Sequence, residues 1–170
     1  MRRAAAVGIW QSICQGRRLS RIGVKLVHPL ARVPEKATGE SAGYDLFAVE
    51  SVTVPPTCST PDGNVEVGRA LVPTGIILNL PAGTVGRIAS RSGLSVRFNI
   101  EVGAGWVDSD YRGEILVEVK NLSSQAYEVS PADRIAQLII LPLAPGELEV
   151  VAEVEETTRG SRGFGSTDEE

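Results

Sequence analysis

The segment GAGWVDSDYRGEI, residues 103–115, places two aspartates, a tyrosine and an arginine between a glycine pair and an apolar run. Asp108 and Asp110 would share a face of an extended chain, because strand side chains repeat every two residues. One carboxylate could then activate water, while the other holds an arginine or a turn. Tyr111 would face the opposite way, so a turn must intervene if all three are to converge. The alternative is a simple turn in which the aspartates only cap the backbone.

Two further segments have the composition of anion-binding sites. In GRIASRSGLS, residues 86–95, a strand-like run leads into an Arg-Ser-Gly turn. Its glycine permits unusual backbone geometry, and its donors could converge on one phosphate. In RGSRGFGST, residues 159–167, arginines could bind phosphate oxygens and the phenylalanine could stack on a base. The alternatives are a solvated loop and a flexible C-terminus.

A single acidic residue lies inside an otherwise apolar segment. In AGYDLFA, residues 42–48, Asp45 follows a tyrosine and precedes leucine and phenylalanine. A carboxylate buried in such surroundings is costly unless it is paired. The sequence therefore predicts an arginine as the partner of Asp45.

Short strands must position these residues. The 170 residues include 18 glycines and 10 prolines, and turn-forming residues recur every ~8–12 residues, which favours an all-β sandwich or barrel. Residues 57–68 are predicted to form a mobile loop. The pattern of ADRIAQL, residues 132–138, fits the one short helix or a strand equally well. We expect a basic leader or disordered tail at 1–22, a β domain at 23–154 and a flexible glycine-rich arm at 155–170.

Charge and composition exclude several classes of function. The net charge is −4, and all 21 acidic residues follow a basic N-terminal stretch. The acidic body should repel nucleic acids and membrane surfaces, and no apolar run approaches the ~20 residues of a membrane span. Cys14, Cys58 and His28 do not have the spacing of a zinc site or of a disulfide framework. We expect an intracellular protein, in the nucleus or cytoplasm, or in a mitochondrion or plastid if the leader is a transit peptide.

Together the segments resemble the trimeric dUTPase family. AGYDLFA, GRIASRSGLS, GAGWVDSDYRGEI, ADRIAQLII and RGSRGFGST occur in the family's order between about Gly23 and Thr167. The resemblance implies a jelly-roll-like β fold and a homotrimer whose active sites lie at subunit interfaces, with a mobile arm closing over a neighbour's site. It also implies hydrolysis of dUTP to dUMP and pyrophosphate, which keeps uracil out of DNA and supplies dUMP for dTTP synthesis. Mg²⁺ would be held by substrate phosphates and water, without a direct protein ligand.

The resemblance also implies roles for individual residues. Asp108 would be the general base for water attack on the α-phosphorus, and Tyr111 would pack under the sugar and exclude the 2′-hydroxyl of UTP. The uracil pocket would be lined by Gly105, Trp106, Val107 and the backbone of Leu116. The phosphates would be held by Arg91, Ser92, Gly93, Arg159, Gly165, Ser166 and Thr167. Phe164 would stack over uracil, and Asp45, Asp110 and Gln137 would support the site.

At four positions the chain departs from the family's usual residues. Proline is usual at Ser90, so the turn before Arg91 is expected to be less rigid. An aliphatic residue is usual at Trp106, whose ring would tighten the pocket or point outward. Glycine is usual at Ala132 and Arg162. The alternatives to a dUTPase are a catalytically silent binding or signalling protein with the same fold and a dCTP deaminase-like enzyme.

Overall fold

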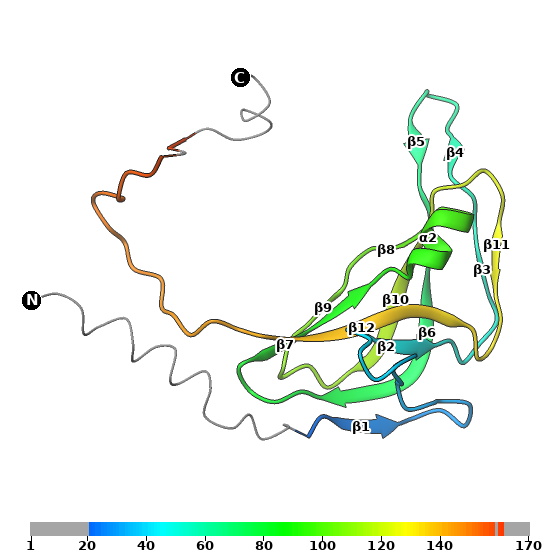
Figure 1. The fold of residues 1–170 in the computed structure, drawn as a ribbon. Coiled ribbons are helices and arrows are strands. Elements are labelled where there is room, and N and C mark those ends of the chain that lie inside the picture. The colour runs from blue at the N-terminus through cyan, green and yellow to red at the C-terminus, as the bar shows by residue number, and fades with distance from the viewer. Residues whose placement is uncertain (1–20, 159, 162–170) are drawn as a thin grey trace, which may run out of the picture.

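The computed structural model describes residues 21–158, 160 and 161, which form antiparallel strands and one short helix (Figure 1). One four-stranded sheet has the order β1-β6-β10-β8. Its strands are β1 (Gly23–Leu26), β6 (Gly68–Asn79), β10 (Glu114–Asn121) and β8 (Ile100–Val102). The second sheet has the order β2-β12-β7-β9. Its strands are β2 (Tyr44–Phe47), β12 (Arg134–Pro142), β7 (Thr84–Ala89) and β9 (Trp106–Val107).

The remaining elements are two short ribbons and a helix. The ribbons pair β3 (Val52–Val54) with β11 (Tyr127–Val129), and β4 (Cys58–Ser59) with β5 (Val65–Glu66). The helix, α2 (Ser92–Phe98), follows β7 directly. The predicted all-β fold with at most one short helix is confirmed for the described residues.

The core forms because alternate side chains of the central strands face inward. In β10, Ile115, Val117, Val119 and Asn121 are buried, and the residues between them are more exposed. Each fully buried aliphatic side chain contributes roughly 1.5–3 kcal/mol relative to an exposed one. Buried residues from both four-stranded sheets form one hydrophobic cluster. The two sheets are therefore fixed relative to each other, and so are the loops at their ends.

The structure decides one open choice of local structure and replaces one predicted loop by a hairpin. The helix lies at 92–98, and residues 134–138 belong to β12, which pairs with β2 on one side and β7 on the other. Pairing on both sides satisfies the strand's backbone groups, which decides between the two conformations that the sequence allowed. Residues 57–68 form the β4–β5 hairpin and its flanks, and this hairpin projects from the body (Figure 1).

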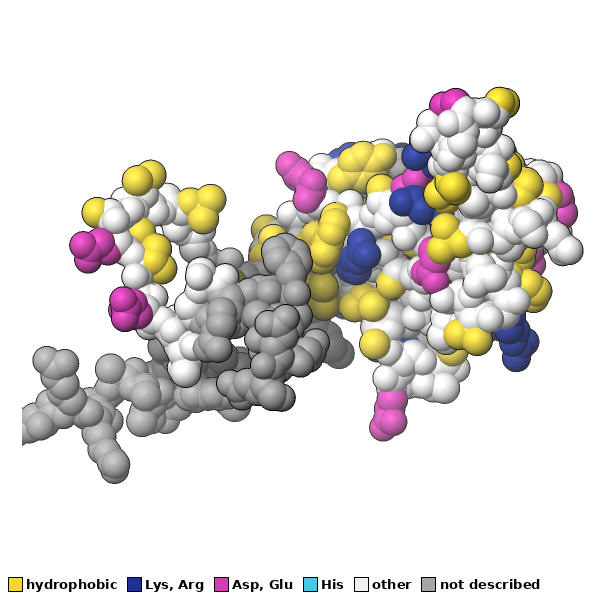
Figure 2. All heavy atoms as spheres, turned by 90° about the horizontal axis from the view of Figure 1, so that it is seen from above, with side chains coloured by type: hydrophobic (Ala, Val, Ile, Leu, Met, Phe, Trp, Pro, Cys, Tyr) yellow, Lys and Arg dark blue, Asp and Glu magenta, His cyan; other side chains and the backbone are white. Residues whose placement is uncertain are grey.

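The described part of the C-terminal segment lies away from the two sheets. It leaves β12 after Pro142 as an extended chain (Figure 1). Leu148 and Val150 are fully exposed there, and Figure 2 shows hydrophobic side chains standing free of the body. Nearly all of the predicted leader, residues 1–22, lies outside the described residues. No helix in the described residues is long and apolar enough to cross a membrane.

Candidate active site

The turn after β9 brings Asp108 and Tyr111 close together. The Tyr111 amide donates to the Asp108 carbonyl oxygen over 3.1 Å. Arg112 braces the turn, since Nη1 donates to the carbonyl oxygens of Ser109 and Tyr111 and Nη2 donates to Asn79 Oδ1. The turn that the sequence required between the two residues is confirmed. Sequence reasoning gave Arg112 no role, although its place within the motif was a signal.

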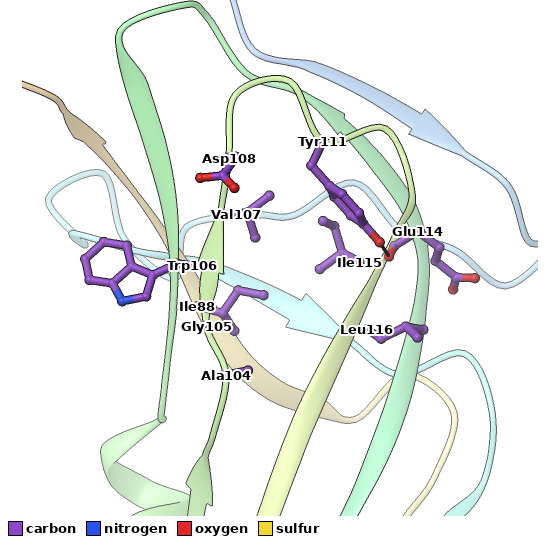
Figure 3. Close-up of a pocket in the computed structure, with 10 residues that line it drawn as sticks. All are labelled: Ile88, Ala104, Gly105, Trp106, Val107, Asp108, Tyr111, Glu114, Ile115 and Leu116. Atoms are coloured by element: carbon purple, nitrogen blue, oxygen red, sulfur yellow. Dashed lines mark hydrogen bonds between the residues drawn. The ribbon is translucent and has the colours of Figure 1, made fainter.

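This turn forms one end of a pocket of about 220 Å³ between β9 and β10 (Figure 3). The lining residues are Ile88, Ala104, Gly105, Trp106, Val107, Asp108, Tyr111, Glu114, Ile115 and Leu116. Every residue predicted to line the uracil pocket is among them, and so are Asp108 and Tyr111. Sequence reasoning missed Ile88, Ala104, Glu114 and Ile115. Of these, Ile88 reaches the pocket through the pairing of β7 with β9, which a single sequence does not display.

Gly105 lets the strands beside the pocket approach closely. Its carbonyl oxygen accepts the Ile88 amide over 2.7 Å. A Cβ on Gly105 would lie 2.4 Å from the Ile88 carbonyl oxygen, so a side chain would force the strands apart. The sequence pointed to close approach by a ligand; the structure shows that the neighbouring strand itself requires this glycine. The pocket wall is therefore mostly main chain at this point.

Trp106 points outward. Its residue surface is 65% exposed, and the indole extends away from the pocket (Figure 3). The Arg87 guanidinium lies 5.0 Å from the ring centroid, within the range of a cation–π contact. Val107, the next residue, is buried and anchors β9 to the core. Of the two orientations that the sequence allowed for the Trp106 ring, the structure shows the one that leaves the pocket open.

Tyr111 lies along the pocket wall because the chain around it makes room. Its hydroxyl donates to the Glu114 carbonyl oxygen over 3.1 Å, shown as the dashed line in Figure 3. A Cβ on Gly113 would lie 2.2 Å from the tyrosine oxygen. The Glu114 carboxylate accepts the Gly75 amide over 2.7 Å, which fixes the start of β10. The ring therefore has a defined position before any ligand binds.

A second group of predicted residues surrounds Asp45. This carboxylate is 2% exposed and forms ion pairs with Arg91 Nε at 3.2 Å and Arg134 Nη1 at 3.4 Å. Arg91 Nη1 also donates to the Arg134 carbonyl oxygen. The predicted arginine partner of Asp45 is confirmed, but Arg134 was not foreseen. Gln137 lies beside Asp45 in the ladder, opposite Ala89 on its other side.

Ser92 and Gly93 form the exposed start of α2. Gly93 has no positive φ, and a Cβ placed there would meet no atom within 4 Å. The expectation that this glycine supplies unusual backbone geometry is therefore wrong. None of the residues in this second group lines the pocket beside Asp108.

The remaining predicted site residues lie outside both groups. Asp110 is exposed in the turn and does not line the pocket. Arg159, Phe164, Gly165, Ser166 and Thr167 lie outside the described residues. Within residues 21–158, 160 and 161, no group of three or more His, Cys, Asp or Glu residues is placed to hold a metal ion.

Comparison with known proteins gives a consistent result. The family model described as dUTPase matches residues 30–168. The deoxyuridine 5'-triphosphate nucleotidohydrolase of Paramecium bursaria Chlorella virus 1 is 42% identical over 149 residues, covering 88% of this chain and 99% of the relative. The mouse protein of the same name is 42% identical over 137 residues, covering 81% of this chain and 78% of the mouse protein.

Solved structures show the same fold. A mutant of the dUTPase from Staphylococcus bacteriophage 80alpha, with dUpNHpp, superposes with a TM-score of 0.75 and 28% identity, covering 86% of this chain and 98% of that one. A mutant of the phage phi11 dUTPase of S. aureus, described as coordinating a structural Mg(II) ion, gives a TM-score of 0.69 at 26% identity. It covers 79% of this chain and 98% of its own.

Proposed function

This chain belongs to the dUTPase family, and we infer that it hydrolyses dUTP to dUMP and pyrophosphate, with Asp108 as general base. The observation that carries the role of Asp108 is that its carboxylate is exposed beside a preformed pocket (Figure 3). No described residue donates a hydrogen bond to this carboxylate or forms an ion pair with it. A general base must be free to accept a proton and must lie within reach of the water that it activates. Asp108 is free to accept a proton, and a nucleotide bound in the pocket would bring the attacking water within its reach.

The pocket fits the nucleoside part of the substrate. Main-chain groups around Gly105 and Leu116 would read the edge of uracil, and the Tyr111 ring would lie under the deoxyribose. The Tyr111 hydroxyl is already bound to the Glu114 carbonyl oxygen, which holds the ring in place. A ring fixed in this way leaves little room for a 2′-hydroxyl, so UTP should be rejected by steric exclusion.

In the reaction, Asp108 accepts a proton from water as the water oxygen bonds to the α-phosphorus. The bond from the α-phosphorus to the oxygen that bridges it to the β-phosphorus breaks, and pyrophosphate leaves. Mg²⁺ on the triphosphate would neutralise the developing charge. The ion would be held by the substrate phosphates and by water, which fits the strong tendency of Mg²⁺ to keep water ligands.

The phosphate-binding residues support a shared site. Arg91, Ser92 and Gly93 do not line the pocket of their own chain. We therefore propose a homotrimer in which these residues face the pocket of a neighbouring subunit. The exposed apolar residues of the C-terminal segment, such as Leu148 and Val150, would also be covered by assembly. A chain ending at Val154 should still assemble but lose most dUTP turnover, and unchanged kcat/KM would refute the role of the arm.

Release of pyrophosphate from dUTP, UTP, dTTP and dCTP tests the proposed function. We expect rapid release from dUTP with Mg²⁺ present and only traces from the other three nucleotides. Comparable turnover of UTP and dUTP would contradict the role of Tyr111. Release of ammonia from dCTP would instead identify a deaminase, and the absence of any turnover would support a silent binding protein.

A further inference from the structure

A cluster of two serines and a glutamate lies directly behind the phosphate-binding turn. The Glu101 carboxylate, on β8, accepts the Ser90 hydroxyl over 2.5 Å through Oε2 and the Ser95 hydroxyl through Oε1. Ser90 Oγ also accepts the Val102 amide over 2.9 Å. Ser90 is thus tied to β8 by two hydrogen bonds at the position where the family usually has proline.

The two serines lie on either side of the turn that carries Arg91 and Ser92. Ser90 is the residue before Arg91, and Ser95 lies in the first turn of α2. The Arg91 carbonyl oxygen accepts the amides of Leu94 at 2.9 Å and Ser95 at 3.0 Å, which closes the backbone between them. One carboxylate therefore fastens both ends of the turn to β8.

The hydrogen bonds to Glu101 favour its charged form. Those from Ser90 and then Ser95 lower the pKa of this carboxyl below its usual value, while partial desolvation opposes them. An ionised carboxylate can accept a hydrogen bond from both hydroxyls at once. In a protonated carboxyl one oxygen carries a hydrogen and acts as a donor, so it is less suited to accept the second hydroxyl. Bonds from a hydroxyl to a carboxylate are also stronger than those between neutral groups.

The turn is fixed from two directions. Asp45 holds the Arg91 side chain through Nε, and Glu101 accepts the hydroxyls of Ser90 and Ser95, which lie before and after Arg91 in the chain. Ser92 and Gly93 are exposed at the start of α2, next to the half-buried Arg91, so a ligand can approach the turn from this side. Groups held in place before binding lose less conformational entropy when a ligand arrives.

We propose that Glu101 is a positioning residue that, through Ser90 and Ser95, holds Arg91 and Ser92 ready for the triphosphate of dUTP. The choice of ligand rests on the proposed function. Glu101 makes no contact with the substrate itself. Its removal should weaken interactions with the β- and γ-phosphates and leave recognition of the nucleoside unchanged.

Affinities for dUpNHpp and dUMP, measured by calorimetry on the full chain with Mg²⁺, test this role. Glu101→Ala and Ser90→Ala should each weaken dUpNHpp binding about tenfold, as expected for one lost hydrogen bond to a charged group. The affinity for dUMP, which lacks the outer phosphates, should change less than about twofold. The KM for dUTP should rise in parallel with the dUpNHpp dissociation constant, with a smaller change in kcat.

The β3–β11 ribbon offers a matched control. Thr53 Oγ1 donates to Glu128 Oε2 over 2.7 Å, which is the same type of bond on a different part of the molecule. Thr53→Ala and Glu128→Ala should leave both affinities unchanged. If Glu101→Ala does not fold, Ser90→Ala, which removes only one oxygen, still decides the matter.

Unchanged dUpNHpp affinity in folded Ser90→Ala and Glu101→Ala would overturn the proposal. An equal loss of dUMP and dUpNHpp affinity would also overturn it, because a general structural defect would act on both ligands. Failure of the unmodified chain to hydrolyse dUTP would instead contradict the proposed function, and the two affinities would still decide the role of Glu101.

Discussion

Two aspartates in this chain have opposite surroundings. Asp45 is buried and pairs with Arg91 and Arg134. Asp108 is exposed beside the pocket, and none of the described residues binds its carboxylate. The same chemical group is therefore fixed as an anchor in one place and left free to react in the other.

The difference follows from the cost of burying a charge. A carboxylate moved out of water loses several kcal/mol of solvation, and only close partners restore it. The two arginines that offset the cost of burying the Asp45 charge also occupy both of its carboxylate oxygens, so Asp45 is unsuited to activating water. Asp108 keeps its solvation in the free protein and can give its oxygens to a water molecule once a substrate binds. Loss of Asp45 should chiefly affect stability, and loss of Asp108 should chiefly affect turnover.

The largest effect on turnover, with the smallest effect on stability, should come from Asp108→Asn. The amide cannot accept the proton of the attacking water, so kcat for dUTP should fall by ~10²–10⁴-fold, or about 3–5 kcal/mol in the barrier. The melting temperature and the affinity for dUpNHpp should stay near those of the parent. Stopped-flow or steady-state pyrophosphate release measures kcat. Scanning calorimetry measures the melting temperature, and titration calorimetry measures the affinity for dUpNHpp. Parent-like kcat in the variant would break the contrast between the two aspartates.

Asp45→Asn should have the opposite profile. Removing the charge leaves two arginines facing each other without a counter-ion, which should lower the free energy of unfolding by about 2–3 kcal/mol, less than for a fully enclosed pair because Arg134 is half exposed. Urea unfolding followed by circular dichroism measures the change. Turnover should fall less than in Asp108→Asn, through misplacement of Arg91. Glu50→Gln, at an exposed position, serves as the control, and an equal loss of stability there would argue against the ion-pair explanation.

The smallest effect should come from the turn that leads into Arg134. Ala132 has a φ of 70°, a left-handed conformation that alanine adopts only with strain. Ala132→Gly should relieve that strain and raise the free energy of unfolding by about 0.5–1 kcal/mol, without changing kcat. Ala70→Gly, within β6, should lower stability by a similar amount because the position has no strain to relieve. A destabilised Ala132→Gly would show that the strain is absent.

The sequence predicted those features of the fold and the site that depend on residues close together in the chain and on simple electrostatics. An acid among apolar residues predicted an arginine partner for Asp45, and two aspartates followed by a tyrosine predicted the turn between Asp108 and Tyr111. Both inferences need only the cost of a buried charge and the period of a strand. The short strands and their turns followed from glycine and proline spacing in the same way.

What the sequence could not predict depends on contacts between distant segments. Whether residues 134–138 form a helix or a strand is decided by pairing with β2 and β7. The outward direction of Trp106 follows from the buried position of Val107 and from Arg87 on the neighbouring strand. The bond between Ser90, which follows β7, and Glu101 on β8 likewise connects elements of two different sheets.

The most direct test of the proposed chemistry is where the oxygen of water ends up. dUTP should be hydrolysed by the full chain with Mg²⁺ in water enriched in oxygen-18, and both products should be analysed by mass spectrometry. Attack on the α-phosphorus by water activated at Asp108 predicts one labelled oxygen in dUMP and none in pyrophosphate. Label in pyrophosphate, with unlabelled dUMP, would show attack on the β-phosphorus and contradict the mechanism.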